Sequence, residues 1–167
     1  MRTGHVAATT SVALVCAALI VPVSALQDPQ HPGLVHRGNA VMGFDQLKTT
    51  HHFYLYEDGG AIDVSVKNLS DTTNRDAIRS HLPHIAMLFN QGDFAAPMLV
   101  HDSKDVPGTA GMTRLKDAIT YTYQQTPAGG RVEIKTTNFE AIKAVHDFLR
   151  FQITDHKTGD SLDIRKR

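Results

Sequence analysis

The sequence predicts an α+β domain in which two tandem strand-strand-helix repeats form an antiparallel sheet with helices packed on one face. Three observations lead to this prediction. Each half of the chain holds two strand-like segments joined at a Gly-Gly pair. Each pair of segments is followed by a stretch with helical apolar spacing, and the two halves match in sequence. Two hairpins leave an apolar face, and two amphipathic helices can cover it.

Alternating apolar residues predict the strands. Residues 51–56 alternate in the manner of a strand, the pair Gly59-Gly60 turns the chain, and residues 61–66 return with apolar side chains on one face. The same pattern recurs at residues 118–123 and 132–136 around a longer turn. We therefore expect one β-hairpin in each half.

A capping signature opens each predicted helix. Thr73 with Asp76, and Thr137 with Glu140, can satisfy free amide donors of a first helical turn. Apolar residues then recur at helical spacing and give each helix one apolar stripe. The stripes consist of Ile78, Leu82, Ile85 and Phe89 in the first helix, and Ile142, Val145, Leu149 and Ile153 in the second.

The two halves are copies of one unit. Residues 73–79 align with 137–143 and differ only at the third position if like charges count as equal. Further matches in the same order place the copies at 33–93 and 98–160. Two shorter matching segments, 33–36 and 98–101, are candidates for edge strands, and residues 102–111 are expected to form a loop between the copies.

The N-terminus reads as a signal peptide, residues 1–25. Arg2 precedes an apolar stretch, 12–21, that is too short to span a bilayer, and small residues support cleavage after Ala25. The residues before Cys16 fit a lipoprotein signal poorly, so we expect no stable membrane anchor. The prediction is a periplasmic or secreted protein whose mature part, 26–167, is a single α+β domain with the internal duplication.

Composition excludes several classes of function. Without Cys16 the mature chain has no cysteine, which removes disulfides, thiolate ligands and thiol catalysis. The mature chain has sixteen Lys and Arg residues and seventeen Asp and Glu residues. Because these charges nearly balance, we expect no nucleic-acid partner. The basic end, residues 165–167, is expected to be a solvated tail.

Histidine is the unusual residue, with nine remaining after cleavage. His81 and His84 are three residues apart and border the apolar stripe of the first helix. His51 shares its strand face with Phe53, whereas His52 lies on the opposite face. His51, His81 and His84 correspond to Ile119, Val145 and Phe148 of the second copy, so three apolar positions are histidine in only one copy.

These histidines predict a metal site formed by His51, His81 and His84, with His101 as a fourth ligand at the edge. Imidazole ligands without thiolates suit zinc or copper(II). Any of Met42, Met87, Met98 and Met112 that lies close would add a soft ligand for copper(I). The leading hypothesis is a small exported binding protein that holds a transition metal, copper or zinc, or a metal-containing cofactor, with haem the less favoured choice.

Simpler explanations exist for each histidine. His36 and His101 match between the copies and can cap turns, and His146 and His156 can be surface or partly buried side chains. Histidines beside an apolar stripe can also be hydrogen-bonded in place without binding anything.

Two other functions are carried as alternatives. The first is a non-catalytic interaction module that uses the open sheet face to bind a partner or to form a homodimer. The second is an enzyme with a histidine general base, which requires a cleft with a histidine and a carboxylate within hydrogen-bond reach. No hydrolase, zinc-protease or phosphate-loop motif supports a particular reaction. The residues expected on the open face are His52, Tyr54, Tyr56, Thr120 and Thr122.

Overall fold

The computed structural model describes residues 32–167, together with Met1. The predicted signal peptide, its cleavage point and Cys16 lie outside the described residues.

Four antiparallel strands form a single sheet in the order β1-β2-β4-β3. The strands are β1 (Thr49–Tyr56), β2 (Gly59–Val66), β3 (Thr120–Thr126) and β4 (Gly129–Lys135). The two hairpins meet where β2 pairs with β4, with Ile62 opposite Val132. The α+β prediction with two strand-strand-helix units is confirmed.

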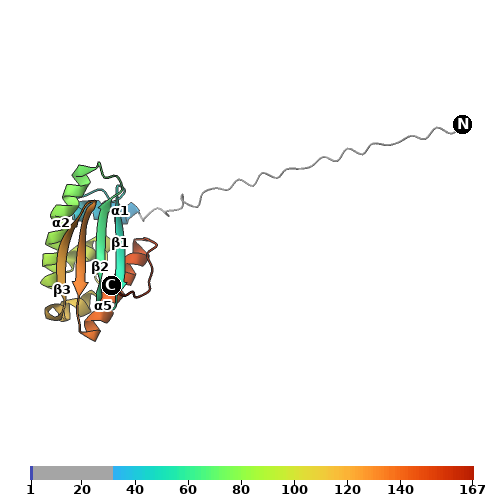
Figure 1. Cartoon of the computed structure of the whole chain (residues 1–167). Coiled ribbons are helices and arrows are strands. Elements are labelled where there is room, and N and C mark those ends of the chain that lie inside the picture. The colour runs from blue at the N-terminus through green and yellow to red at the C-terminus, as the bar shows by residue number, and fades with distance from the viewer. Residues whose placement is uncertain (2–31) are drawn as a thin grey trace.

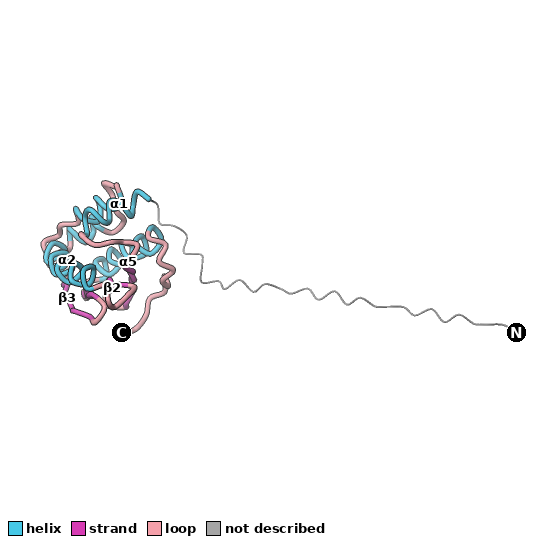
Figure 2. The backbone as a smooth tube through the Cα atoms, turned by 90° about the horizontal axis from the view of Figure 1, so that it is seen from above, coloured by secondary structure: helices cyan, strands magenta, loops and turns pink. Residues whose placement is uncertain are grey.

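Two long helices cover one face of this sheet, α2 (Thr72–Asn90) and α5 (Phe139–Asp155) (Figures 1 and 2). Each packs mainly over the hairpin of the other copy: α2 lies over β3 and β4, and α5 lies over β1 and β2. The exchange interlocks the two copies, because each hairpin is covered mainly by the helix of the other copy.

The segments proposed as edge strands are helical instead. Residues 33–36 belong to α1 (Pro32–Met42) and residues 98–101 to α3 (Ala95–His101). Proline lies in the first turn of both helices, where its missing N–H costs nothing and its fixed φ suits a helix. The strand assignment was wrong because the apolar triplets at these sites are too short to separate strand from helix by periodicity.

The expected loop 102–111 also contains structure. Helix α4 (Thr109–Arg114) starts within it, and the short 3₁₀ helix η2 (Lys116–Ala118) follows before β3. Gly108, with φ +85°, precedes α4 and lies against the backbone of α5.

The helix caps differ by one or two residues from those predicted. Asp71 caps α2 and accepts from the Asn74 N–H at 3.1 Å. Asn138 caps α5 and accepts from two amides, those of Glu140 and Ala141. Carboxylate and amide oxygens serve as well as the threonine hydroxyls we had expected.

The core lies between the sheet and the two long helices. The apolar residues of β1 and β2 that face the helices are buried, and so are both predicted apolar stripes except Ile142, which is half-buried. The largest side chains with less than 2% exposure include Phe148, Leu55, Ile78, Met112, Ile134 and Leu149.

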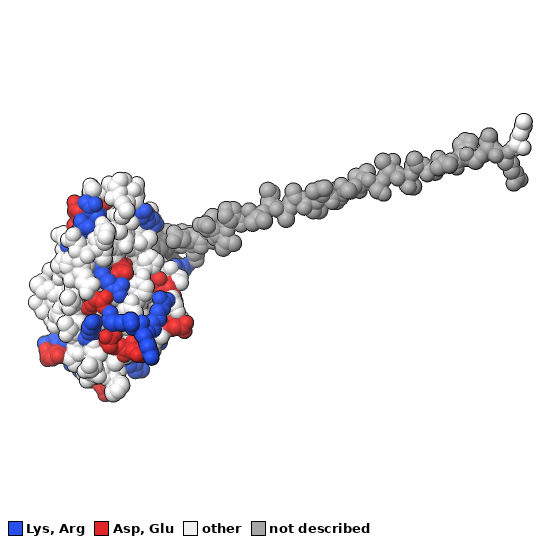
Figure 3. Space-filling view, in the orientation of Figure 1, with Lys and Arg blue, Asp and Glu red and all other residues white. Residues whose placement is uncertain are grey.

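The C-terminal segment is not a solvated tail. Arg165 pairs with Tyr56 in a parallel bridge, and the Arg165 N–H donates to Leu55 O at 3.0 Å, which extends the sheet beyond β1. The Arg167 guanidinium lies 4.3 Å from the Tyr56 ring centre and pairs with Asp58 and Glu133. These residues contribute to a patch of mixed charge on the open sheet face (Figure 3).

Candidate functional site

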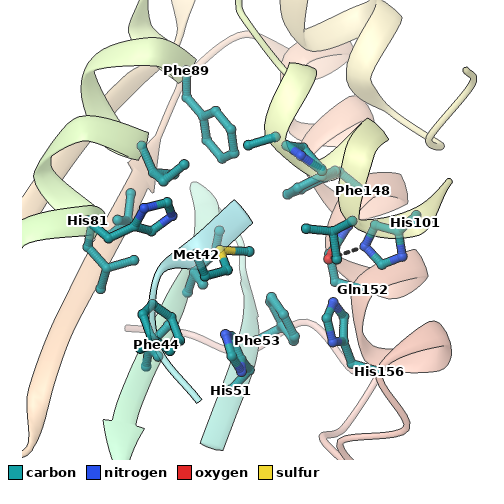
Figure 4. A pocket seen from close by; sticks show the side chains of 18 residues that line it. Met42, Phe44, His51, Phe53, His81, Phe89, His101, Phe148, Gln152 and His156 are labelled. Atoms are coloured by element: carbon teal, nitrogen blue, oxygen red, sulfur yellow. Dashed lines mark hydrogen bonds between the residues drawn. The ribbon is translucent and has the colours of Figure 1, made fainter. Parts of the chain in front are cut away.

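An apolar cavity of about 50 Å³ lies between the helical face of the sheet and the helices (Figure 4). Its walls come from β1, β2, β4, α2, α3 and α5, together with the end of α1 and the residues that follow it. The labelled residues in its wall are Met42, Phe44, His51, Phe53, His81, Phe89, His101, Phe148, Gln152 and His156.

The pleat of β1 places His51 and Phe53 in the cavity wall and turns His52 to the opposite side. This is the orientation expected from the alternation. His52 Nδ1 donates to Asp160 Oδ1 at 2.9 Å, and the Phe53 N–H donates to the other carboxylate oxygen at 2.9 Å. Asp160 therefore holds this part of β1 in place.

Helix α2 brings His81, but not His84, to the cavity. His84 is exposed and lines an outer hollow with residues 40–43, Ala77 and Ser80. His81 and Met42 line both the hollow and the cavity, so these two side chains separate them.

His101 lies in the cavity wall at the end of α3, and both of its ring nitrogens are engaged. Nδ1 is hydrogen-bonded to Asp155 Oδ2 at 2.6 Å, and Nε2 lies 3.0 Å from the side-chain amide of Gln152. The structure thus holds a histidine-carboxylate pair beside a cavity, but the nitrogen that a general base would use already bonds to Gln152.

His156 joins the site, although its place in the sequence predicted a surface or partly buried residue. It follows α5 directly, is 5% exposed, and stacks on His51 with ring centres 5.6 Å apart. Its ring is also 5.0 Å from that of His101. The sequence contains one indication that His156 faces the core. His156 lies three residues after Ile153 and so continues the apolar stripe of α5.

Three polar atoms in the cavity wall lack hydrogen-bond partners among the described residues. They are Nε2 of His51, Nε2 of His81 and the amide nitrogen Nε2 of Gln152, and all three are buried. Buried polar atoms are nearly always paired, so each unpaired atom calls for an explanation.

Burial favours the neutral form of His51, His81 and His156. It lowers the pKa of His51 to about 4, with smaller contributions from His52 and His81. It lowers the pKa of His81 to about 4, with a further contribution from His84. The pKa of His156 is lowered well below 6.5, again mainly by burial. Neutral imidazoles have a free nitrogen lone pair near pH 7.

Phe44 links the two unpaired histidines. Its ring stacks on His51 at 6.0 Å between centres and meets His81 edge-on at 5.9 Å. The His51 imidazole on β1 and the His81 imidazole on α2 therefore pack against the same ring, which restrains both.

The cavity wall has no Asp, Glu, Lys or Arg among its lining residues. Within residues 32–167, no three His, Cys, Asp or Glu side chains stand close enough together to hold a metal ion. A metal bound at this site must therefore use fewer than three such side chains, or another type of ligand.

The remaining predicted positions lie elsewhere. His36 is exposed on α1. His146 is buried, and its Nε2 donates to the carbonyl oxygens of Tyr56 (2.9 Å) and Gly59 (3.1 Å), which fastens α5 to the turn of the first hairpin.

Comparison with known proteins gives no match to a family model, to a curated protein or to a solved structure. None of the helices in residues 32–167 combines the length and the apolar character needed to cross a bilayer.

Proposed function

We propose that this protein is a small exported binding protein that holds a transition-metal ion, copper or zinc, at the cavity lined by His51 and His81. The observation that carries the proposal is that these two buried nitrogens line the same cavity and have no hydrogen-bond partner among the described residues. Neutral imidazole nitrogens are common metal ligands.

The free energy lost by burying two unpaired histidine nitrogens supports a role for these residues beyond packing. A buried polar atom without a partner costs about 1–3 kcal/mol. The second copy has Ile119 and Val145 at the matching positions, and both are buried at 4% and 0% exposure. Apolar side chains therefore suit these positions of the repeat, and a bound ligand would offset the cost of histidine.

The proposal narrows the ligand set expected from the sequence. It keeps His51 and His81. It omits His84, which lies at the surface, and His101, whose two ring nitrogens are already engaged in hydrogen bonds. The cavity volume of about 50 Å³ favours a single ion over haem, because it has room for only one or two water-sized groups.

Metal analysis of the full chain tests this proposal. The purified protein is dialysed, analysed for copper, zinc and iron, and then titrated with copper and zinc. We expect one ion per chain in the wild type, and loss of binding in His51→Phe and in His81→Leu.

Two matched variants control for nonspecific effects. His52→Phe changes the neighbouring histidine on the other sheet face, and His84→Ala changes the exposed histidine of α2. Both should keep the ion. A wild-type protein that binds neither copper nor zinc, or variants that bind as well as the wild type, would overturn the proposal.

The open sheet face supports a second candidate, an interaction module that binds a partner or a second copy. The Tyr54 and Tyr56 rings are stacked there at 6.3 Å, and Arg131 pairs with Asp63 and Glu133. Sedimentation at several protein concentrations tests self-association, and a monomer throughout would count against the homodimer.

A further inference from the structure

Within residues 32–167, the chain covers one edge of the sheet and leaves most of the other edge open. At the β1 edge, the Phe53 N–H donates to Asp160 Oδ2 at 2.9 Å. The Arg165 N–H donates to Leu55 O at 3.0 Å, so the C-terminal segment takes up the outward backbone groups of β1. The opposite edge is β3, which lies beside α2 in Figure 1.

Asn90 of α2 covers a single position of the β3 edge. Its side chain accepts from the Tyr121 N–H at 3.1 Å and donates to Tyr121 O at 2.9 Å, as a neighbouring strand would. Tyr121 therefore directs its backbone groups away from β4. Because this direction alternates along an antiparallel strand, Tyr123 and Gln125 also direct their N–H and C=O groups outward. No hydrogen bond from another part of residues 32–167 reaches these groups.

The sequence of β3 has none of the features that usually prevent strand edges from pairing. Proteins protect open edges with lysine, proline or a bulge. The strand TYTYQQT contains no charged residue and no proline, and its register with β4 is continuous from Thr120 to Thr126. Two of its side chains on the open sheet face, Thr122 and Gln124, are exposed. The edge is therefore open to an incoming strand.

Helix α2 adds an apolar strip beside this edge. Arg79 and Asn90 both hydrogen-bond to β3, so the side of α2 between them lies along the strand. Pro83 and Met87 follow Arg79 by four and eight residues, which places them on this side of the helix, and both are exposed. A partner that pairs with β3 can also bury these two side chains.

We infer that the β3 edge binds a second copy of this chain, so that the two four-stranded sheets join into one antiparallel sheet about a two-fold axis. The free backbone groups of both copies are used when Tyr123 of each copy pairs with Gln125 of the other. Gln124 then lies opposite Gln124 of the second copy, at the axis. This interface is separate from the open sheet face, and it goes beyond the proposed function because it does not involve the cavity.

Charge and symmetry favour a second copy as the partner. Two neutral strands bring no like charges into opposition. Arg79 bonds near the end of β3 and Asn90 near its start, so the antiparallel arrangement places Arg79 of one copy beside Asn90 of the other and keeps the two cations apart. The strips formed by Pro83 and Met87 lie on the same side of the joined sheet and meet across the axis, which removes apolar surface from water.

Analytical ultracentrifugation of the full chain with charge-swapped variants tests the inference. We expect the wild type to form a dimer that dissociates on dilution. Gln124→Lys places two like charges opposite each other at the axis, so it should weaken the dimer at least about tenfold, and Gln124→Glu should do the same. An equal mixture of the two variants brings opposite charges together and should restore a dimer with one chain of each.

Thr50→Lys is the matched control. Thr50 lies on β1, the strand at the other edge of the sheet, and alternation places its side chain on the same face as that of Gln124. This variant should form the dimer as well as the wild type does. A wild type that stays monomeric at all concentrations, or a dimer that Gln124→Lys leaves intact, would overturn the inference.

Hydrogen exchange of single amides provides a second measurement. The amides of Tyr123 and Gln125 should exchange slowly at high protein concentration and faster on dilution, whereas the Tyr121 amide, bonded to Asn90, should be protected at both. Protection of Tyr123 and Gln125 that does not change with concentration would overturn the inference, because the edge would then be covered within one chain.

Discussion

His101 and Asp155 are joined by a hydrogen bond of 2.6 Å between Nδ1 and Oδ2, which ties the end of α3 to the last turn of α5. The His101 side chain is only 2% exposed. Removing its partner in Asp155→Ala leaves a buried nitrogen unpaired, so we expect the free energy of unfolding to fall by about 1–3 kcal/mol. Urea denaturation measures this loss.

Asp147→Ala is the control on the same helix. Asp147 accepts from Lys143 Nζ at 2.6 Å, but the Lys143 side chain is 78% exposed. An exposed pair at this spacing contributes only about 0.3–0.5 kcal/mol. Equal losses in the two variants would mean that the His101 contact adds nothing beyond a surface pair.

The stability of the metal-free protein should fall in acid. Burial lowers the pKa of His51 and of His81 from 6.5 to about 4, so between these values the unfolded chain binds more protons than the folded one. The contribution of the neutral histidines is therefore complete above pH 6.5 and is lost as the pH falls towards 4. Urea denaturation at a series of pH values measures it.

His51→Phe separates this effect from general acid denaturation. The variant removes one buried titrating group, so its loss between pH 6.5 and 4 should be smaller than that of the wild type by about 2–3 kcal/mol. At pH 7 it should be at least as stable as the wild type, because the unpaired nitrogen is gone. An unchanged pH profile would contradict the assignment of a low pKa to His51.

Gly108 is required where α4 approaches α5. Its φ is +85°, and a Cβ atom there would lie 2.2 Å from the carbonyl oxygen of Ala144 and 2.7 Å from the Phe148 nitrogen. Both contacts are with backbone, which cannot move aside cheaply. We expect Gly108→Ala to cost more than about 2 kcal/mol, measured by thermal or urea unfolding.

Gly43→Ala provides the comparison. Gly43 also has a positive φ, +74°, but a Cβ atom there would have nothing within 4 Å. Only the backbone strain of about 1 kcal/mol should remain. A loss at Gly43 as large as that at Gly108 would show that the clash with α5 has no effect.

Arg167 should stabilise the sheet edge. It packs on Tyr56, donates to Asp58 Oδ1 at 2.7 Å, and pairs with Glu133, which is 9% exposed. Arg167→Ala should lower the free energy of unfolding by about 1–2 kcal/mol, through the lost cation-π contact and the weakened pairing of a buried carboxylate. Lys166→Ala, at an exposed neighbouring position, should change it by less than about 0.5 kcal/mol. Thermal denaturation compares the two, and a similar loss in both would contradict a specific role for Arg167.

Local patterns were enough to predict the hairpins and the long helices. Alternation along β1 and β2 placed His51 and His52 on opposite faces, and the structure has His51 in the cavity wall and His52 bonded to Asp160. The secondary structure of short segments could not be predicted in this way. Residues 33–36 and 98–101 contain too few apolar positions to distinguish a strand from a helix.

The sequence by itself determined the α+β class, the two hairpins and the apolar stripes, because periodicity is a property of neighbouring residues. Only the tertiary structure decided which histidines meet. Pairing of β2 with β4 joins the two hairpins, and each long helix then crosses to the hairpin of the other copy. That exchange brings His156 onto His51 and leaves His84 outside, and no spacing within one copy encodes it because the contacts join residues far apart in the chain.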